Sequence, residues 1–385
     1  MSSTRKKFAS ASTFKTARRC VGAATQFKDA RTQSQTEGAS KRRHSDAEIE
    51  DARMRRKGDE MTYFITGATG LVGSLLVKRL LAEEPGCQII AHIRNLEKAH
   101  AMLGEHENLF FVIGDIREEI VLPDSLKDIG KIDYIIHCAA ITTSKTMVEQ
   151  PELTLKIATE GTKSVLDFAR KQGVKSAVYL SSMEVYGQTA LEQNPITEEK
   201  MGTLDLENPR SSYPMSKRLC EEMCVEYYKK YDVPVKIARL AQITGPGIPK
   251  TDNRIAMQFA KAVRDGNDVE LHTEGKSISN FCYTEDALNG ILTILHKGIN
   301  GEAYNVCNDK ESRSIAEIGK LVVEKVAEAR GKKIKLVFNI PETNIHGYAP
   351  DTVMRLNSDK LRALGWEPVV SMEEAYNRLV DYLEV

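Results

Sequence analysis

The sequence lacks the patterns that mark several classes of protein. It has no run of about 18 apolar residues, the length a helix needs to cross a membrane. Its seven cysteines form no CxxC pair, and Cys220 and Cys224 have no histidine or second pair near them, so we expect no metal site. Cysteines without a disulfide framework are typical of a reducing compartment. We therefore expect a cytoplasmic protein with no membrane partner.

The chain also lacks an excess of either charge, because 54 Lys and Arg residues balance 54 Asp and Glu residues. The charge is uneven, since residues 1–60 hold 15 basic against 8 acidic residues and the remainder is acidic. A nucleic-acid-binding protein would carry a basic surface, so we expect residues 61–385 to bind no nucleic acid. Residues 1–60 lack apolar periodicity, which predicts a disordered basic extension. Alternatively, residues 1–43, with 11 basic and 2 acidic residues, could be an organellar targeting segment.

From residue 62 onward, strand-like and helix-like segments alternate. Short apolar runs such as TYFIT, QIIAHI, YIIHCA and SAVYLS are separated by stretches of helical periodicity. This alternation predicts an α/β fold, a doubly wound parallel sheet of the Rossmann type. The alternation of strand-like and helix-like segments becomes irregular after residue 240. We therefore expect a dinucleotide-binding domain at 61–240 and a smaller α/β lobe at 241–385 that mainly binds substrate.

A glycine-rich turn follows the first expected strand. Gly67, Gly70 and Gly73 lie where that strand meets the first helix, and glycines there let the backbone approach a pyrophosphate at the helix N-terminus. In this strand–turn–helix context the spacing predicts a dinucleotide site. The residues expected to contact the cofactor are Gly67, Thr69, Gly70, Leu71, Val72, Gly73, Arg94, Asp115, Ile116, Ala139, Ala140, Tyr213 and Lys217.

The end of the second strand bears on the choice between NAD and NADP. An acidic side chain there would bind the ribose 2′-hydroxyl of NAD, but Ile93 and then Arg94 occupy the place. A guanidinium can hold a 2′-phosphate, which favours NADP, although an Arg94 that stacks on adenine would leave NAD possible. Asp115 after the third strand is expected to accept from the adenine amino group. Small Ala139 and Ala140 after the fourth let the dinucleotide lie against the sheet.

Three residues form the expected catalytic group. Tyr213 and Lys217 make a YxxxK pair, which on a helix places them on one face. An ammonium beside a phenol favours the phenolate, so we expect a lowered Tyr213 pKa and a general base. Ser182, at the end of the preceding strand, can hydrogen-bond the substrate oxygen.

Together, the motifs TGATGLVG, GDI, HCAA, SSMEVYG and YPMSK resemble the ordered signatures of the extended short-chain dehydrogenase/reductase family, over residues 62 to about 380. The resemblance implies a Rossmann domain, a nicotinamide cofactor and a nucleotide-sugar substrate. It also implies a catalytic role for Glu184, substrate contacts by Gln242 and by Arg355, which would reach the diphosphate, and a homodimer formed by helices near 152–172 and 212–231.

Some positions depart from the family pattern. Met183 stands where the 4,6-dehydratases carry an acid, so we expect no 4,6-dehydration, whereas Glu184 remains as in the UDP-glucuronate decarboxylases. Ala158 and Gln242 stand where the family has asparagine. Ser279 stands where the family has a phosphate-contacting arginine, which removes one charged diphosphate contact.

The expected function is a nucleotide-sugar 4-epimerase acting through a transient 4-keto sugar. Decarboxylation of a UDP-glucuronate-type sugar shares its first step and stays open. A net NADPH-dependent reduction, which would follow if the cofactor were released, also stays open. A ketone reductase for other substrates and a non-catalytic NAD(P)-sensing scaffold are further alternatives. The intact Ser182, Tyr213 and Lys217 weigh against the scaffold, and the stretches GPG and GWEP weigh against other substrates.

Overall fold

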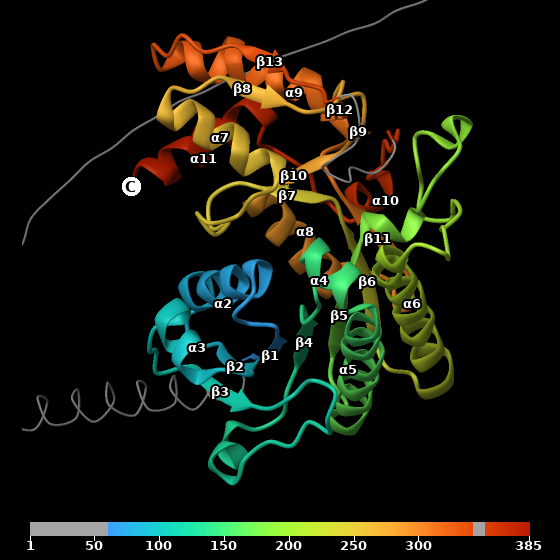
Figure 1. The fold of residues 1–385 in the computed structure, drawn as a ribbon. Coiled ribbons are helices and arrows are strands. Elements are labelled where there is room, and N and C mark those ends of the chain that lie inside the picture. Colours follow the sequence, from blue (N-terminus) through green and yellow to red (C-terminus); the bar gives the residue numbers. More distant parts are fainter. Residues whose placement is uncertain (1–60, 342–350) are drawn as a thin grey trace, which may run out of the picture. The chain divides into compact units, whose positions relative to one another are not determined.

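The computed structural model describes residues 61–341 and 351–385. The expectations for residues 1–60 lie outside these ranges. A seven-stranded sheet, parallel throughout, has the strand order β11-β6-β5-β4-β1-β2-β3 (Figure 1). Its strands are β1 (Thr62–Thr66), β2 (Gln88–Ile93), β3 (Leu109–Ile113), β4 (Tyr134–His137), β5 (Ser176–Ser182), β6 (Val235–Leu240) and β11 (Ala303–Val306).

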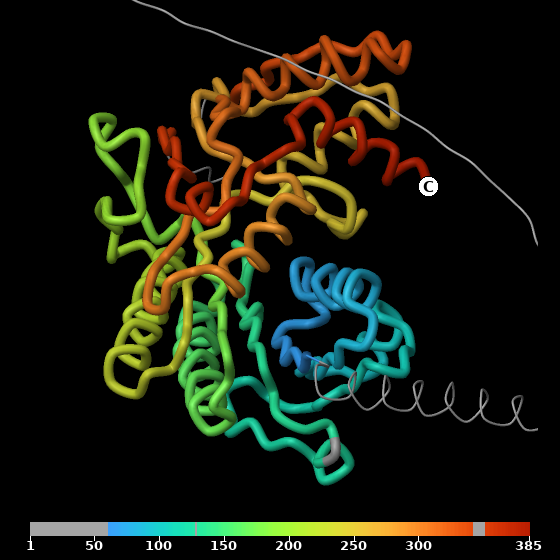
Figure 2. Tube along the Cα trace, turned by 180° about the vertical axis from the view of Figure 1, so that it is seen from behind, coloured from blue at the N-terminus to red at the C-terminus, as the bar shows by residue number. Residues whose placement is uncertain are grey.

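Helices cover both faces of the sheet. Successive residues of β1 point to opposite faces, so that Ile65 packs with one hydrophobic cluster and Phe64 with another. On the Phe64 side, α5 (Pro151–Gln172) and α6 (Ser212–Tyr231) lie side by side in both views (Figures 1 and 2). The other face is covered by α2 (Leu71–Glu83), α3 (Leu96–Leu103) and α8 (Thr284–Lys297). The doubly wound α/β fold expected from the sequence is confirmed.

Most of the chain beyond residue 240 forms a smaller lobe with its own apolar core, built largely from α7, α9 and α11. Its sheets are two-stranded, and they pair β10 with β7, β12 with β9 and β13 with β8. The strands are β7 (Gln242–Thr244), β8 (Val269–Leu271), β9 (Ile278–Ser279), β10 (Phe281–Tyr283), β12 (Arg313–Ser314) and β13 (Leu336–Phe338). The helices are α7 (Ile255–Asp265), α9 (Ile315–Leu321), which continues as a π-helix at Val322–Ala327, α10 (Asp359–Arg362) and α11 (Met372–Glu384).

Two elements beyond residue 240, one strand and one helix, pack with the main sheet. Strand β11 pairs with β6 along its whole length, and α8 packs on β5 and β6. The lobe is therefore joined to the sheet by strand pairing as well as by side-chain packing. Short helices complete the described ranges, namely α4 (Ser144–Glu149) and 3-10 turns at Asp124–Ile129, Met183–Tyr186, Leu191–Gln193, Pro209–Ser211 and Asp309–Glu311. Within these ranges no helix is long and apolar enough to span a membrane.

Candidate functional site

The carboxyl ends of the parallel strands bring the expected cofactor residues to one edge of the sheet. Gly67 follows β1, Ala139 follows β4 and Arg94 follows β2, and these three strands are neighbours. The strand order reverses between β1 and β4, which is the point where ligands bind in open α/β sheets. The turn after β1 contacts the end of β4 directly, because the Ala139 N–H donates to Thr66 Oγ1 at 3.2 Å.

The glycine turn has no room for side chains. Gly67 has a φ of +64°, and a Cβ there would lie 2.7 Å from the Ala139 nitrogen. A Cβ at Gly73 would lie 2.3 Å from the Gly67 carbonyl oxygen, so the turn packs directly on the helix. Gly70 is the N-cap residue of α2, whose first turn has no capping side chain and no acidic residue. Free backbone N–H groups and the positive end of the helix dipole are thus available to a pyrophosphate.

Asp115 and Arg94 both lie at this edge, but only Asp115 has a strong partner. The carboxylate of Asp115 accepts two hydrogen bonds from the Arg117 guanidinium, at 2.9 and 2.7 Å. These bonds, with one from the Arg117 backbone, lower the Asp115 pKa to about 2. Asp115 is therefore an anion engaged with Arg117, while Arg94 is exposed beyond the end of β2. The sequence did not indicate the Arg117 contact.

The expected catalytic residues come together at the end of β5. Tyr213 and Lys217, in the first turns of α6, are both buried, and the Ser182 hydroxyl lies close enough to Tyr213 to lower its pKa. The Lys217 ammonium donates to the Leu180 carbonyl oxygen at 2.6 Å and lies 5.7 Å from the centre of the Tyr213 ring. The phenol, the hydroxyl and the ammonium thus meet at the carboxyl end of β5.

The expected fall in the Tyr213 pKa is wrong for this structure. Burial and the nearby Glu184 carboxylate raise the Tyr213 pKa to about 12, against the opposing effects of Ser182 and the Arg210 guanidinium. Lys217 contributes little because its ammonium is directed to the Leu180 carbonyl and lies 4.6 Å from the Tyr179 ring centre. Phenolate formation here therefore depends on further positive charge.

Glu184 belongs to the same group and has a partner that the sequence did not reveal. Its carboxylate accepts from Arg210 Nη2 at 2.8 Å, and the Arg210 guanidinium lies 5.5 Å from the Tyr213 ring centre. Both charged side chains are partly exposed. Arg210 lies just before α6, in a stretch without any motif. A charged pair able to contact a polar ligand therefore lies against the phenol.

A buried ion pair lies behind this group. Glu221, one turn beyond Lys217, accepts from Arg239 Nη2 at 2.6 Å and from Ser181 Oγ at 2.5 Å. Arg239 also donates to the Tyr186 hydroxyl at 3.0 Å. The pair therefore ties α6, β6 and the turn after β5 together. The YxxxK spacing pointed to Lys217 and not to the next turn of the helix, so sequence reasoning missed both members.

The two expected substrate residues lie on segments that adjoin the catalytic group. Gln242 is exposed two residues beyond Leu240, which pairs with Ser182 across β5 and β6. Arg355 is also exposed, and its neighbours Met354 and Leu356 pack in one apolar cluster with Met183.

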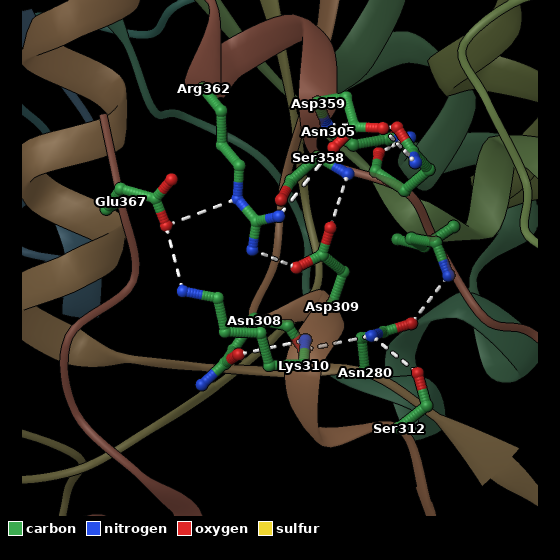
Figure 3. A network of polar contacts seen from close by, with 12 residues as sticks. Asn280, Asn305, Asn308, Asp309, Lys310, Ser312, Ser358, Asp359, Arg362 and Glu367 are labelled. Carbon is green, nitrogen blue, oxygen red and sulfur yellow. Dashed lines mark hydrogen bonds and ion pairs between the residues drawn. The ribbon is translucent and has the colours of Figure 1, made fainter. Parts of the chain in front are cut away.

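A polar network holds the segment that carries Arg355 (Figure 3). Asn280 accepts from the Leu356 N–H at 2.6 Å and donates to the Asn308 carbonyl at 3.0 Å. The Asp309 carboxylate accepts from the Ser358 N–H and from Arg362, which also pairs with Glu367. The segment is thereby fixed against the end of β11. In the described ranges no group of three His, Cys, Asp or Glu residues could hold a metal ion.

Comparisons with known proteins agree with this geometry. Residues 63–307 match the model of the NAD dependent epimerase/dehydratase family. UDP-glucuronic acid decarboxylase 1 of Xenopus tropicalis is 28% identical over 332 residues, which is 84% of this chain and 72% of the relative. The dTDP-D-glucose 4,6-dehydratase of Mus musculus is 25% identical over 332 residues, covering 83% and 87%. The structure of UDP-glucuronic acid 4-epimerase from Bacillus cereus, with UDP-glucuronic acid and NAD, superposes with a TM-score of 0.67 at 21% identity, covering 84% and 99%.

Proposed function

The chain belongs to the NAD dependent epimerase/dehydratase family, whose enzymes act on nucleotide sugars, and we propose that its own reaction begins with oxidation of the sugar at C4. The site fits a dinucleotide, because the crowded Gly67 and Gly73 and the uncapped start of α2 form a cradle for a pyrophosphate. The bound nicotinamide would supply the hydride acceptor and a positive charge near the phenol.

In this proposal Tyr213 is the general base that takes the proton of the sugar 4-hydroxyl. Ser182, whose hydroxyl lies near the phenol, holds the same oxygen in place. Lys217 is buried, and its ammonium lies 5.7 Å from the centre of the Tyr213 ring. Loss of the proton and of the C4 hydride leaves a 4-keto sugar, which epimerisation and decarboxylation share.

We propose decarboxylation of a UDP-glucuronate-type sugar as the net reaction. The observation that carries this choice is the ion pair of Glu184 and Arg210 beside Tyr213. A 4-ketone makes a C6 carboxylate a β-keto acid, so CO₂ can leave with the electron pair passing to the ketone oxygen. Arg210 is the cation placed to bind the carboxylate before it leaves. Glu184, which is partly exposed and can take a proton from water, is the group placed to deliver that proton to C5. Return of the hydride to C4 would then complete the net decarboxylation. The similarity to UDP-glucuronic acid decarboxylase 1 supports the same choice.

The second candidate is 4-epimerisation, the function expected from the sequence. Epimerisation needs only Ser182, Tyr213 and Lys217, and it gives Glu184 no catalytic role. Dehydration is disfavoured because it would require an acidic side chain at position 183. Met183 is apolar and packs in a cluster of buried hydrophobic residues. Net reduction by NADPH is the third possibility and depends on release of the cofactor.

A panel of nucleotide sugars distinguishes these reactions. Purified protein is incubated with UDP-, dTDP-, CDP- and GDP-linked sugars, with and without added NAD, NADP or NADPH, and the products are identified by mass spectrometry and NMR. We expect CO₂ and a pentose nucleotide from UDP-glucuronate. If the product has an inverted C4 centre and the same mass as the substrate, the net reaction is epimerisation and not decarboxylation. If no sugar nucleotide were turned over under any condition, the whole proposal would fail.

We propose that Arg94 selects NADP over NAD, although the family is described as NAD dependent. Arg94 is exposed beyond β2, and no acidic side chain occupies the preceding place. Replacing Arg94 by Ala should weaken NADP binding roughly 10- to 100-fold, because a charge-assisted contact with the 2′-phosphate is lost, and should leave NAD binding unchanged. Calorimetric titration of both variants with both cofactors measures this. Equal losses for NAD and NADP would mean that Arg94 stacks on adenine instead.

We also propose a homodimer formed by α5 and α6. The two helices expose Leu155, Met215 and Leu219, and the last two lie one turn apart on one face of α6. Changing Leu219 to Glu should place a charge in that interface and convert the dimer to monomer. Light scattering after gel filtration measures the mass, with the exposed Leu191, outside these helices, changed to Glu as the matched control. A wild-type monomer, or a Leu219 variant that stayed dimeric, would refute this interface.

A further inference from the structure

The 3-10 turn after β5 is closed tightly onto a later part of the chain. Tyr186, the last residue of this turn, accepts at its carbonyl oxygen from the Gly202 N–H at 2.8 Å. Gln188 and Thr203 then exchange two backbone hydrogen bonds, at 2.9 and 3.0 Å. A Cβ at Gly202 would lie only 2.0 Å from the Gln188 carbonyl oxygen, so no side chain fits between the two segments. Residues 187–203 therefore form a loop whose base adjoins the turn.

One arginine of α6 holds both the turn and the base of this loop. Arg218 Nε donates to the Val185 carbonyl oxygen at 2.7 Å. Its Nη2 donates to the carbonyl oxygens of Gly202 at 2.8 Å and of Tyr186 at 3.3 Å. Three backbone acceptors thus converge on one guanidinium, whose planar set of N–H donors can serve them together. Because Arg218 directly follows Lys217, these bonds join the turn and the loop to the catalytic part of α6.

Arg218 is directed to neutral acceptors although a carboxylate lies near it on the same helix. That carboxylate, on Glu221, is already bound by Arg239 Nη2 at 2.6 Å and by Ser181 Oγ at 2.5 Å. The charges of Glu221 and Arg239 act on the Arg218 pKa in opposite directions, and burial is the main cause that lowers it. An arginine still keeps its charge at any pH of interest. The hydrogen bonds of Arg218 therefore fix backbone positions and do not neutralise a carboxylate.

The place of the turn decides where the Glu184 carboxylate lies. Glu184 belongs to the turn and directly precedes Val185, whose carbonyl Arg218 holds. Its carboxylate accepts from Arg210 Nη2 at 2.8 Å, and the Arg210 guanidinium lies 5.5 Å from the Tyr213 ring centre. Arg210 comes from a separate turn just before α6. The ion pair beside the phenol therefore forms only while both turns keep their places.

We propose that Arg218 is a positioning residue, which holds the turn after β5 so that the Glu184 carboxylate stays against Arg210 and Tyr213. This proposal rests on the proposed function, in which Glu184 delivers a proton and Tyr213 takes one. Arg218 acts through the backbone of the turn and not through its own charge, since it is not among the groups that act on the Tyr213 pKa.

The groups around Tyr213 give this positioning a measurable consequence. After burial, Glu184 is the largest cause that raises the Tyr213 pKa, and Arg210 lowers it. From α6, the Lys217 ammonium lies 5.7 Å from the Tyr213 ring centre, and from β5, Tyr179 interacts with Tyr213. If the turn were released, Glu184 would be free to turn to solvent while the other groups stayed. The Tyr213 pKa would then fall.

The test compares Arg218 variants in two backgrounds, the natural chain and a chain with Glu184→Gln. Tyrosines of the full chain are isotope-labelled at the ring carbon that bears the hydroxyl and followed by NMR, and the signal lost in Tyr213→Phe identifies Tyr213. With saturating oxidised cofactor, Arg218→Ala should lower the Tyr213 pKa by up to about one pH unit. Arg218→Lys should give a smaller fall, because an ammonium cannot serve three fixed carbonyls as a guanidinium does. In the Glu184→Gln background neither change should lower the pKa further.

Arg330→Ala is the matched control, because it removes another partly buried arginine that donates to a backbone carbonyl, that of Asn377 at 2.9 Å in the smaller lobe. It should leave the Tyr213 pKa unchanged. Melting temperatures establish which variants fold, and Arg218→Lys carries the test if the Ala variant does not. The proposal is overturned if the folded Arg218 variants leave the pKa unchanged. It is also overturned if they lower it equally in the Glu184→Gln background, since a general loosening of the site would then be the cause.

Turnover separates this proposal from the proposed function. In Arg218→Ala the rise of kcat/KM with pH should move to lower pH, and kcat should fall by less than in Glu184→Gln. The dissociation constant of the cofactor should not change. If the Tyr213 pKa falls as expected but no variant turns over a nucleotide sugar, the role of Arg218 stands and the proposed function fails. If the natural chain turns over its sugar and Arg218→Ala has the same pH profile, the role of Arg218 fails alone.

Discussion

Replacing Tyr213 by Phe should lower kcat roughly 10²- to 10⁴-fold and leave the dissociation constant of the cofactor unchanged. The phenol is a buried acid–base group beside Ser182, whose hydroxyl acts on the Tyr213 pKa. Phenylalanine keeps the ring and its packing on α6 but has no proton to exchange with the sugar 4-hydroxyl. Turnover of the preferred nucleotide sugar and calorimetric titration of the cofactor measure the two quantities.

Lys229, exposed near the C-terminal end of α6, provides the control for this change. Its replacement by Gln alters the same helix far along the chain from Tyr213 and should keep full activity. A Tyr213 to Phe variant with kcat within threefold of wild type would show that another group is the base. If a biological activity of the protein persisted in a variant without turnover, the NAD(P)-sensing scaffold would become the better account.

The second large effect concerns Glu184 and Arg210, whose charges act on Tyr213 in opposite directions. After burial, Glu184 is the strongest influence that raises the Tyr213 pKa, whereas Arg210 lowers it. C4 oxidation needs the phenolate, so its rate rises with pH as Tyr213 loses its proton. Glu184 to Gln should therefore move this rise to lower pH, and Arg210 to Gln should move it to higher pH. The pH dependence of kcat/KM measures both shifts.

The same two variants separate the candidate reactions. If Glu184 returns a proton to C5 after CO₂ leaves, its replacement by Gln should lower product formation roughly 10²-fold or more. Arg210 to Gln should raise KM for a substrate with a C6 carboxylate and have little effect on a neutral sugar. Shifts of both pH profiles in one direction would contradict the electrostatic account. Normal decarboxylation by the Glu184 variant would remove its proposed role.

Local patterns in the sequence were sufficient for the fold and for the centre of the site. The Gly67 turn and the Tyr213–Lys217 spacing are contained in short segments whose geometry follows from one strand–turn–helix unit or one helix face. Their meeting with Ser182 followed from the rule that parallel strands present their carboxyl ends at one edge.

The contacts missed from the sequence join residues that are distant along the chain or carry no motif. Arg210 lies in a loop 26 residues from Glu184, and Arg239 reaches Glu221 across 18 residues. The pairing of Arg313 with Ser279 depends on strand register, which two-residue strands do not reveal in a sequence. The Tyr213 pKa was misjudged because burial, which no spacing records, is the largest cause that raises it, and Lys217 is not among the groups that lower it.

The most direct test of the central claim follows the hydrogen at C4 of the sugar. The preferred nucleotide sugar is prepared with deuterium at C4 and, separately, at C5, and is mixed with the enzyme and oxidised cofactor under single-turnover conditions. Mass spectrometry of the quenched cofactor is the readout. The account predicts that the reduced cofactor gains deuterium from the C4-labelled sugar and none from the C5-labelled sugar. Product formation without deuterium in the cofactor at any time would contradict it.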